Sequence, residues 1–314
     1  MKCLVSGATG FIGRHLCQQL ADRGDTVIAL SRSGSPLPDG TPTLALDLAA
    51  GELEPDLLQG VEVVFHLAGI AHRQAEPDAY RQVNHQATVK LARAAEVAGV
   101  RCFVFLSSVK AMGPSPGDAA RGEQDCLPPG DAYGRSKWLA ESALREAFAD
   151  SAMAVVILRP ALVYGAGAKG NLELLAKAVR LGLPRPPAGG GRSMIACEDL
   201  VALLLYVADH PPRGMHTWIV CDGQSYSSRY LHDLLRRGMG RGVGTAWLPA
   251  WAWRLGASLL DRVRRHPGEP TWDKLFGTEL YSNRALLAAT GWRPRVTLEA
   301  SLGGQTGDGG KWQP

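Results

Sequence analysis

KCLVSGATGFIG, residues 2–13, decides the fold of this chain. An apolar run leads into glycines at positions 7, 10 and 13, and FIGRHLCQQLADRG (11–24) then carries apolar residues at helical spacing. Gly7 permits a tight turn, Gly10 lets the backbone approach a pyrophosphate, and Gly13 allows the helix to pack closely on the strand. The helix N-terminus offers N–H groups and a positive dipole end to phosphate. This junction predicts a dinucleotide site that includes Gly7, Gly10, Phe11, Ile12 and Gly13.

The alternation of strand and helix continues toward the middle of the chain. Helices are predicted over 78–98 and 133–149, and short apolar strands over 26–30, 43–46, 61–69, 102–108 and 154–160. Because strands that are apolar on both sides must be covered on both faces, the pattern predicts a doubly wound parallel sheet of the α/β class. Ligands of such sheets bind beyond the carboxyl ends of the strands.

Beyond Pro160 the pattern loosens, and two regions are expected. Residues 1–163 are predicted to form a dinucleotide-binding Rossmann domain, and 192–222 returns to it with a helix near 199–209 and a strand near 216–221. Residues 164–191 and 223–314 are predicted to form a smaller C-terminal substrate-binding region.

Composition narrows the class of protein. Hydrophobic residues make up 46% of the 314 positions and charged residues 20%, which is typical of a soluble globular protein. A net charge of +4 with one short basic cluster argues against a nucleic-acid partner; the cluster is Arg262, Arg264 and Arg265. Six cysteines without a CxxC pair predict reduced core residues, no metal site and a cytoplasmic location. No signal peptide and no membrane span are expected.

The segment WLPAWAWRLGASLLDRVRR (247–265) allows two interpretations. Trp and Leu on one side with Arg on the other are typical of a helix that lies in a membrane interface. We favour a helix packed on the smaller region, with peripheral membrane contact as the minor alternative. A homodimer is left open.

The end of the second strand bears on the choice of cofactor. An NAD site usually has Asp or Glu there to hold the ribose 2′-hydroxyl, but this chain has Ser31 followed by Arg32. A guanidinium can pair with a 2′-phosphate, so NADP(H) is favoured and NAD(H) is the alternative. A solvated surface arginine is the simpler interpretation of Arg32. Asp47 and Leu48, after the third strand, are predicted to contact adenine.

Tyr133 and Lys137 lie four positions apart, which places both side chains on one face of the predicted helix 133–149. The ammonium, the helix N-terminus and a nicotinamide ring would all favour the phenolate, so Tyr133 is expected to exchange a proton near neutral pH. Ser107 and Ser108, at the end of an earlier strand, supply a hydroxyl that can orient a reacting oxygen.

Five motifs together resemble the extended short-chain dehydrogenase/reductase family. They are GATGFIG (7–13), HLAG (66–69), SSVKAMG (107–113), YGRSK (133–137) and LRPALVYGAG (158–167). The similarity runs to GWRPRVTLEASL (291–302), and within the family the chain resembles the UDP-glucose 4-epimerase group of nucleotide-sugar enzymes.

The resemblance implies a role for each matching residue. It makes Ser108 the catalytic hydroxyl, Tyr133 the acid/base and Lys137 the residue that also binds the nicotinamide ribose. Asn84, in VNHQAT, matches an asparagine near that ribose, and Leu67, Ala68 and Pro160 fall at cofactor positions. Arg192, in RSMIACEDL, and Asn171, in KGNLELL, match residues that contact the substrate diphosphate.

One departure from the family pattern bears on the reaction. The 4,6-dehydratases have Asp-Glu after their catalytic hydroxyl, whereas this chain has Val109 and Lys110, so dehydration is not expected. SSVKAMG resembles the 4-keto-6-deoxy-sugar reductases of surface-polysaccharide pathways, and Ser31-Arg32 agrees with an NADPH-consuming reductase. We therefore expect reduction of a UDP-4-keto-6-deoxy-hexosamine at C4. The alternatives are a nucleotide-sugar C4 epimerase and a dinucleotide-binding sensor without turnover.

Overall fold

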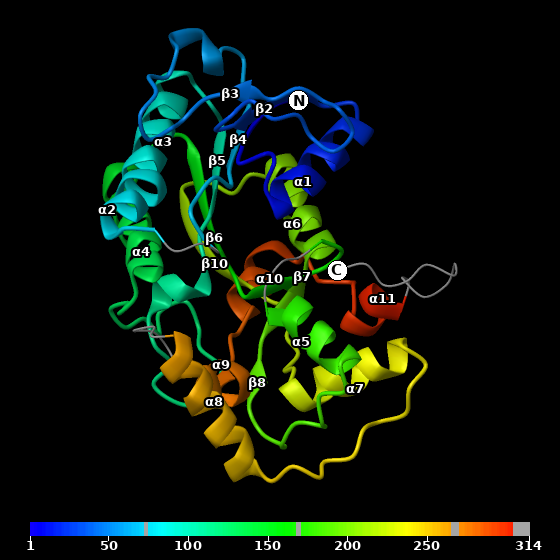
Figure 1. The fold of residues 1–314 in the computed structure, drawn as a ribbon. Coiled ribbons are helices and arrows are strands. Elements are labelled where there is room, and N and C mark those ends of the chain that lie inside the picture. The colour runs from blue at the N-terminus through cyan, green and yellow to red at the C-terminus, as the bar shows by residue number, and fades with distance from the viewer. Residues whose placement is uncertain (72–74, 168–170, 265–269, 304–314) are drawn as a thin grey trace.

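The computed structural model describes residues 1–71, 75–167, 171–264 and 270–303. Its centre is a parallel sheet of seven strands in the order β10-β6-β5-β4-β1-β2-β3 (Figure 1). The strands are β1 (Lys2–Ser6), β2 (Thr26–Ser31), β3 (Leu44–Ala45), β4 (Val63–His66), β5 (Cys102–Leu106), β6 (Ala154–Pro160) and β10 (Met215–Val220). The order reverses beside β1, so the strands on its two sides wind in opposite directions. This confirms the predicted doubly wound α/β fold.

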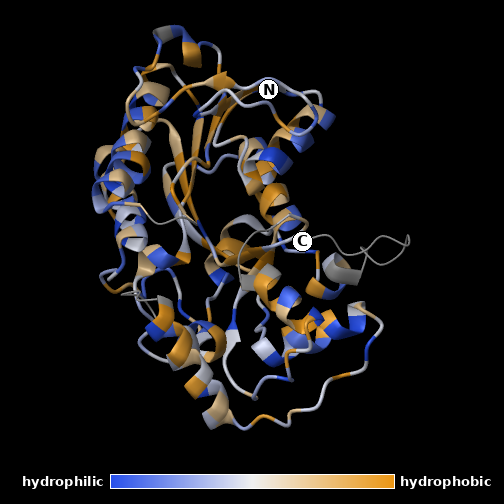
Figure 2. Ribbon diagram, viewed as in Figure 1, coloured by the Kyte–Doolittle hydropathy of each residue, from blue (hydrophilic) through white to orange (hydrophobic). Residues whose placement is uncertain are grey.

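Helices cover both faces of this sheet. On one face α1 (Phe11–Asp22) and α6 (Cys197–Asp209) pack against a buried cluster that includes Val5, Phe65 and Val104. On the other face α3 (Ala87–Val97) and α4 (Ala132–Ala147) pack against alternate residues of the same strands, among them Phe103 and Phe105. Figure 2 shows hydrophobic residues along the central strands, as expected for strands buried on both sides.

Several elements differ in extent from their prediction, among them the strand expected over 102–108, which ends at Leu106. The single helix expected over 78–98 is divided into α2 (Pro77–Tyr80), a π-helical turn η2 (Arg81–Gln86) and α3. The strand expected over 61–69 ends at His66, because the chain then crosses the backbone of Gly7. Short 3₁₀ turns, η1 (Pro55–Leu58) and η3 (Val109–Met112), precede β4 and follow β5.

The smaller region lies below the carboxyl ends of the strands in Figure 1. It holds two short parallel pairs, β7 (Leu162–Tyr164) with β9 (Met194–Ala196) and β8 (Gly191–Arg192) with β11 (Thr278–Glu279). Its helices are α5 (Asn171–Arg180), α7 (Ser228–Gly238), α8 (Ala250–Arg264), α9 (Thr271–Phe276) and α11 (Leu298–Gly303). Helix α10 (Arg284–Thr290) returns to the sheet, where Leu286 joins the core on the face of α1 and α6, although the predicted division assigns 223–314 to the smaller region.

Within the described ranges, none of the helices combines the length and the hydropathy that crossing a bilayer requires.

Candidate functional site

The glycine-rich turn between β1 and α1 is crowded by backbone on two sides. Gly7 has a φ of +72°, and a Cβ there would lie 2.7 Å from the amide nitrogen of Ala68. A Cβ on Gly13 would overlap the Gly7 carbonyl oxygen. Gly10 is the N-cap of α1 and donates its N–H to Gly7 at 2.9 Å. Because only glycine fits this cradle at a helix N-terminus, the turn fits the pyrophosphate of a dinucleotide.

A buried chain of hydrogen bonds joins the ends of β1 and β4 to helix α3. His66 is fully buried, with Nδ1 2.6 Å from Ser6 Oγ and Nε2 2.8 Å from Thr88 Oγ1. Thr88 donates to the Asn84 carbonyl at 2.9 Å, so it accepts from His66 Nε2, and Ser6 donates to Nδ1. Burial, with a smaller effect of Lys137, lowers the pKa of His66 to about 3. The His66 ring is therefore neutral, and its hydrogen bonds hold the ends of β1 and β4 in place.

Asn84 lies in the π-helical turn η2 and is fully buried. Its Oδ1 accepts from the Ile70 N–H at 2.7 Å, and its Nδ2 donates to the Ile70 carbonyl at 3.0 Å and to Ser136 Oγ at 2.9 Å. A Cβ on Gly69 would lie 3.0 Å from Asn84 Oδ1 and 3.3 Å from Lys137 Nζ. The loop after β4, the turn η2 and helix α4 thus meet at Gly69, and Asn84 fixes that loop.

Tyr133 lies in the first turn of α4, whose N-cap is Asp131. The Ser108 side chain, which follows β5, lies near enough to the Tyr133 hydroxyl to lower its pKa. Burial raises the pKa of Tyr133, and although Ser108 opposes this, Asp131 and Tyr80 add to the rise. This direction is opposite to the expected lowering, because burial of the phenol outweighs the opposing effect of Ser108. The group is therefore a protonated phenol at neutral pH, which is the form that donates a proton.

Lys137 follows one turn later on the same face of α4 and is buried. Its Nζ donates to the Leu106 carbonyl at 2.9 Å and lies 4.6 Å from the centre of the Phe105 ring. Burial lowers the pKa of Lys137 to about 8, against the opposing effect of Glu141. The Lys137 ammonium is thus hydrogen-bonded to the last residue of β5, the strand that leads into Ser107 and Ser108.

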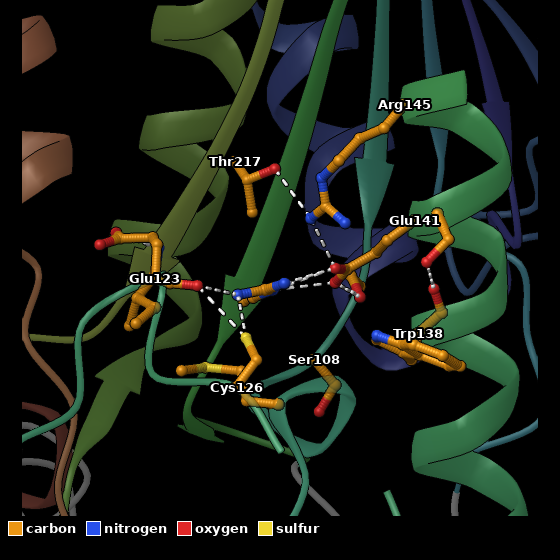
Figure 3. Close-up of polar contacts among 12 residues, drawn as sticks. Ser108, Glu123, Cys126, Trp138, Glu141, Arg145 and Thr217 are labelled. Carbon is orange, nitrogen blue, oxygen red and sulfur yellow. Dashed lines mark hydrogen bonds and ion pairs between the residues drawn. The ribbon is translucent and has the colours of Figure 1, made fainter. Parts of the chain in front are cut away.

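The two adjacent serines have different surroundings. Ser107 Oγ donates to Glu141 Oε1 at 2.5 Å, and Glu141 is fully buried. Arg159 reaches both carboxylate oxygens of Glu141, with its Nε 3.0 Å from Oε1 and its Nη2 2.6 Å from Oε2, and Arg145 adds a bond of 2.9 Å. Figure 3 shows this network and shows Ser108 directed away from it. The structure therefore assigns Ser107 to the packing of α4 and leaves Ser108 beside Tyr133.

The end of β2 holds the residues that bear on the choice of cofactor. Ser31 is buried, and its Oγ lies 2.7 Å from Thr43 Oγ1. Arg32 is exposed, and in the described part of the chain no hydrogen bond or ion pair holds its guanidinium. Asp47 is exposed and its Oδ1 accepts from the Ala49 N–H at 3.0 Å, whereas Leu48 is buried in the core near α3.

Arg192, predicted to contact the diphosphate, forms an ion pair inside the protein. Its Nη1 lies 2.6 Å from Glu279 Oε2, and Nη2 donates to the Asp273 carbonyl at 2.9 Å. Glu279 also accepts from Lys110 Nζ at 2.7 Å. Burial alone would raise the pKa of Glu279, but Lys110 and Arg192 outweigh it, so its pKa lies below the ordinary value. Asn171 begins α5, and its side chain lies outside the described residues.

The remaining predicted cofactor residues line the same edge. Phe11 and Ile12 begin α1, and both are partly buried against the core. Leu67 and Ala68 follow β4, and the Ala68 N–H donates to Ser6 Oγ at 3.3 Å. Pro160 is the last residue of β6. Since the sheet is parallel, all these positions fall at the carboxyl ends of its strands.

Sequence reasoning missed three groups at the site. Glu279 is far from Arg192 and Lys110 in the chain, and nothing in its local sequence marks it. Tyr80, whose ring centre lies 6.4 Å from that of Tyr133, precedes an irregular turn that a helical pattern hides. His66 is part of the HLAG motif, yet only the fold shows its partners. Among the described residues, no cluster of His, Cys, Asp or Glu side chains could hold a metal ion.

Comparison with known proteins adds four findings. A family model described as the NAD dependent epimerase/dehydratase family matches residues 3–221. A UDP-glucose 4-epimerase of Vibrio cholerae is 32% identical, and the match covers 94% of this chain and 92% of that protein. A UDP-2-acetamido-2,6-beta-L-arabino-hexul-4-ose reductase of Pseudomonas aeruginosa is 32% identical over 54% of this chain and 38% of that protein. The solved structure of MoeE5 in complex with UDP-glucose and NAD has a TM-score of 0.76 at 26% identity, covering 98% of this chain and 97% of MoeE5.

Proposed function

Because this chain belongs to the NAD-dependent epimerase/dehydratase family, we propose that it reduces the C4 keto group of a UDP-4-keto-6-deoxy-hexosamine with NADPH, for surface polysaccharide synthesis. The residues at the end of β2 are the observation that supports a reductase over the alternatives. Ser31 is bonded to Thr43 there, and the exposed Arg32 follows where an NAD site would have a carboxylate. A guanidinium at this place favours a 2′-phosphate, and NADPH is the usual donor for net reduction.

The protein's own groups fit the proton transfer that such a reduction needs. Bound nicotinamide would supply hydride to C4. Tyr133 holds its proton at neutral pH because burial raises its pKa, and it donates that proton to the C4 oxygen. Ser108, which lies beside Tyr133 and lowers its pKa, would hold the same oxygen. Lys137 is charged below its pKa of about 8 and stabilises the phenolate that remains.

The surroundings of Ser108 support reduction over dehydration. Val109 is buried, and Lys110 is paired with Glu279. A general acid for dehydration needs a carboxyl that is protonated near neutral pH. Glu279 is the carboxylate that Lys110 contacts, and its two cationic partners keep its pKa below the ordinary value. It is therefore a poor acid.

The substrate diphosphate would bind at Arg192, with Asn171 as a second contact. In this arrangement the phosphate must share the Arg192 guanidinium with Glu279, or it must displace Glu279 from Arg192. Lys110 then balances the charge of Glu279, because it contacts the other carboxylate oxygen. The proposal thus gives Lys110 a part in sugar-nucleotide binding.

A C4 epimerase is the second candidate. The Vibrio cholerae relative supports it, because that match runs over nearly the whole of both chains. MoeE5, with UDP-glucose and NAD bound, supports it as well. The same pair of residues, Ser108 and Tyr133, would serve an oxidation followed by a reduction. A sensor without turnover is a third candidate, but it gives no reason for the proximity of these two hydroxyls.

The test is the stoichiometry of cofactor use. Incubation with a UDP-4-keto-6-deoxy-hexosamine and NADPH should consume one NADPH for each sugar reduced, measured by absorbance and by chromatography of the nucleotide-sugar. UDP-glucose and UDP-N-acetylglucosamine should give no C4 epimer under the same conditions. Epimer formation without net use of cofactor would sink the reductase and establish the second candidate. No turnover of any of these sugars, with NADPH still bound, would favour the sensor.

A further inference from the structure

Helix α8 carries an apolar stripe on its exposed side. Trp251, Leu255, Leu259 and Val263 follow one another every four residues, and Trp247 precedes the helix at the same spacing. Each of the five exposes at least half of its surface, from 50% for Leu259 to 80% for Val263. Residues four apart lie on one face of a helix, so the four side chains on α8 form a continuous surface, the α8 stripe. Contiguous exposed apolar patches often mark an interaction site.

The opposite side of α8 packs on α9. The Trp253 ring meets that of Phe276 edge to face at 5.7 Å, and Ala257 is buried. Asp261 accepts from the Thr271 N–H at 3.1 Å, which caps the start of α9. These residues alternate with the stripe and lie about 200° around the helix from it. The packing expected for this segment is therefore present on one side of α8, while the stripe remains outside it.

The exposed charged side chains that the structure describes on α8 are positive. Arg254 is exposed and lies 4.8 Å from the Trp272 ring centre, and Arg262 is exposed at the far end of the helix. The one carboxylate of α8, Asp261, is bonded to Thr271 on the inner side.

We propose that the α8 stripe docks on the surface of an anionic phospholipid bilayer. Trp and Leu side chains would enter the headgroup region, and Arg254 and Arg262 would pair with lipid phosphates. The helix has 15 residues, about 22 Å, so it would lie in the plane of the interface. Figure 1 places α8 at the outer edge of the smaller region, at the opposite end of the molecule from β3.

Charge favours the bilayer over a second copy of this chain. A two-fold dimer through the stripe would set the same surface against itself. Arg254 and Arg262 would then approach their own copies, and no acidic side chain on the exposed face of α8 would offset them. An anionic lipid surface supplies that missing negative charge.

Co-sedimentation of the full chain with vesicles tests the proposal. The protein should pellet with phosphatidylcholine vesicles that contain roughly a third phosphatidylglycerol, more weakly as salt is raised, and much less with phosphatidylcholine alone. The double variant Trp251→Ser/Leu255→Ser should lower the partition coefficient on the order of tenfold, and so should Arg254→Gln/Arg262→Gln. Both should keep the parent's circular dichroism spectrum and its turnover of a soluble nucleotide-sugar.

The matched control is Val97→Ser/Leu181→Ser, which removes two exposed apolar side chains far from α8 in the chain and should partition like the parent. The proposal fails if the parent does not bind the anionic vesicles, or if this control loses as much binding as the stripe variant. It also fails if light scattering shows that the parent is a dimer which the stripe variant splits, because the stripe is then an interface between copies.

Discussion

One oxygen atom distinguishes Tyr133 from phenylalanine, and the proposed chemistry depends on it. Tyr133→Phe should keep the fold and the affinity for cofactor, because the ring still packs beside Tyr80. Turnover should fall by roughly 10²–10⁴, which is the usual contribution of a positioned acid/base. Steady-state kinetics and cofactor titration measure the two effects separately. Activity near that of the parent would remove Tyr133 from the mechanism.

Arg32 offers a second test at the scale of one residue. If its guanidinium holds a 2′-phosphate, the parent should bind NADPH more tightly than NADH. Arg32→Ala should then lower that preference by about 1–3 kcal/mol, as expected for hydrogen bonds to a charged group. Titration of both cofactors against both proteins gives the ratio. An unchanged ratio would mean that Arg32 is only a solvated arginine.

At single positions, sequence spacing identified the candidate site residues, but it did not predict which side chains those residues contact. The four-residue interval places Tyr133 and Lys137 on one face of α4, and the structure keeps it. The direction of the Tyr133 pKa could not be predicted, because it depends on burial by residues from several elements. Arg192 is a similar case, since its partner Glu279 lies on a different strand.

At the scale of elements, α4 depends on one buried carboxylate. Glu141 receives Ser107, Arg145 and Arg159, and the Arg159 side chain is itself buried. Glu141→Gln should destabilise the protein by about 3–5 kcal/mol in denaturant unfolding, because it leaves the Arg159 charge buried without its partner. Turnover should fall as well, because Ser107 bonds Glu141 and a shift of Ser107 would move the adjacent Ser108.

Arg145→Gln is the matched control for this network, because Arg145 is partly exposed and bonds the same carboxylate. Its cost should stay below about 1 kcal/mol. The double variant Glu141→Leu/Arg159→Met should recover much of the lost stability, because it removes both charges together. Equal costs for Glu141→Gln and Arg145→Gln would contradict the assignment of the buried pair.

Helices and strands could be predicted where the spacing of apolar residues follows a single helical or strand period. They could not be predicted where the backbone departs from that period. The strands of the sheet follow their apolar runs within a few residues. The π turn η2 was hidden inside an ordinary helical pattern, because one wider turn barely alters the spacing of apolar residues. For α8 the sequence shows an amphipathic helix, but which side is covered depends on α9.

At the scale of the whole molecule, His66 should make stability depend on pH. The unfolded chain takes up a proton near pH 6.5, whereas the buried ring resists it down to about pH 3. The unfolded state therefore binds more protons below pH 6.5, and the free energy of unfolding falls as the pH falls through that window. The loss from this group should reach about 2 kcal/mol at pH 5.

Denaturant unfolding between pH 7 and pH 4 measures this loss. His66→Asn removes the titrating group, so its stability should fall less steeply with acid than that of the parent. His210→Asn, at an exposed histidine, is the matched control and should follow the parent. Identical slopes for all three proteins would show that burial of His66 is not what makes the fold sensitive to acid.

The doubly wound sheet could be predicted from the sequence because it repeats one local unit. The smaller region could be predicted only in outline, since its two-residue strands β8 and β11 carry no pattern of their own. Their pairing brings Glu279 to Arg192 across 87 positions of the chain. Contacts of that separation depend on the whole fold.

The path of the chain between its two regions has a consequence for how specificity can be exchanged. The chain leaves the large sheet after β6, returns with α6 and β10, leaves again, and comes back at α10, where Leu286 enters the core. A chimera with one crossover would therefore combine part of the smaller region of one parent with part of the other's. Recombination between relatives can transfer the smaller region intact only if two separate segments, one before α6 and one after β10, move together.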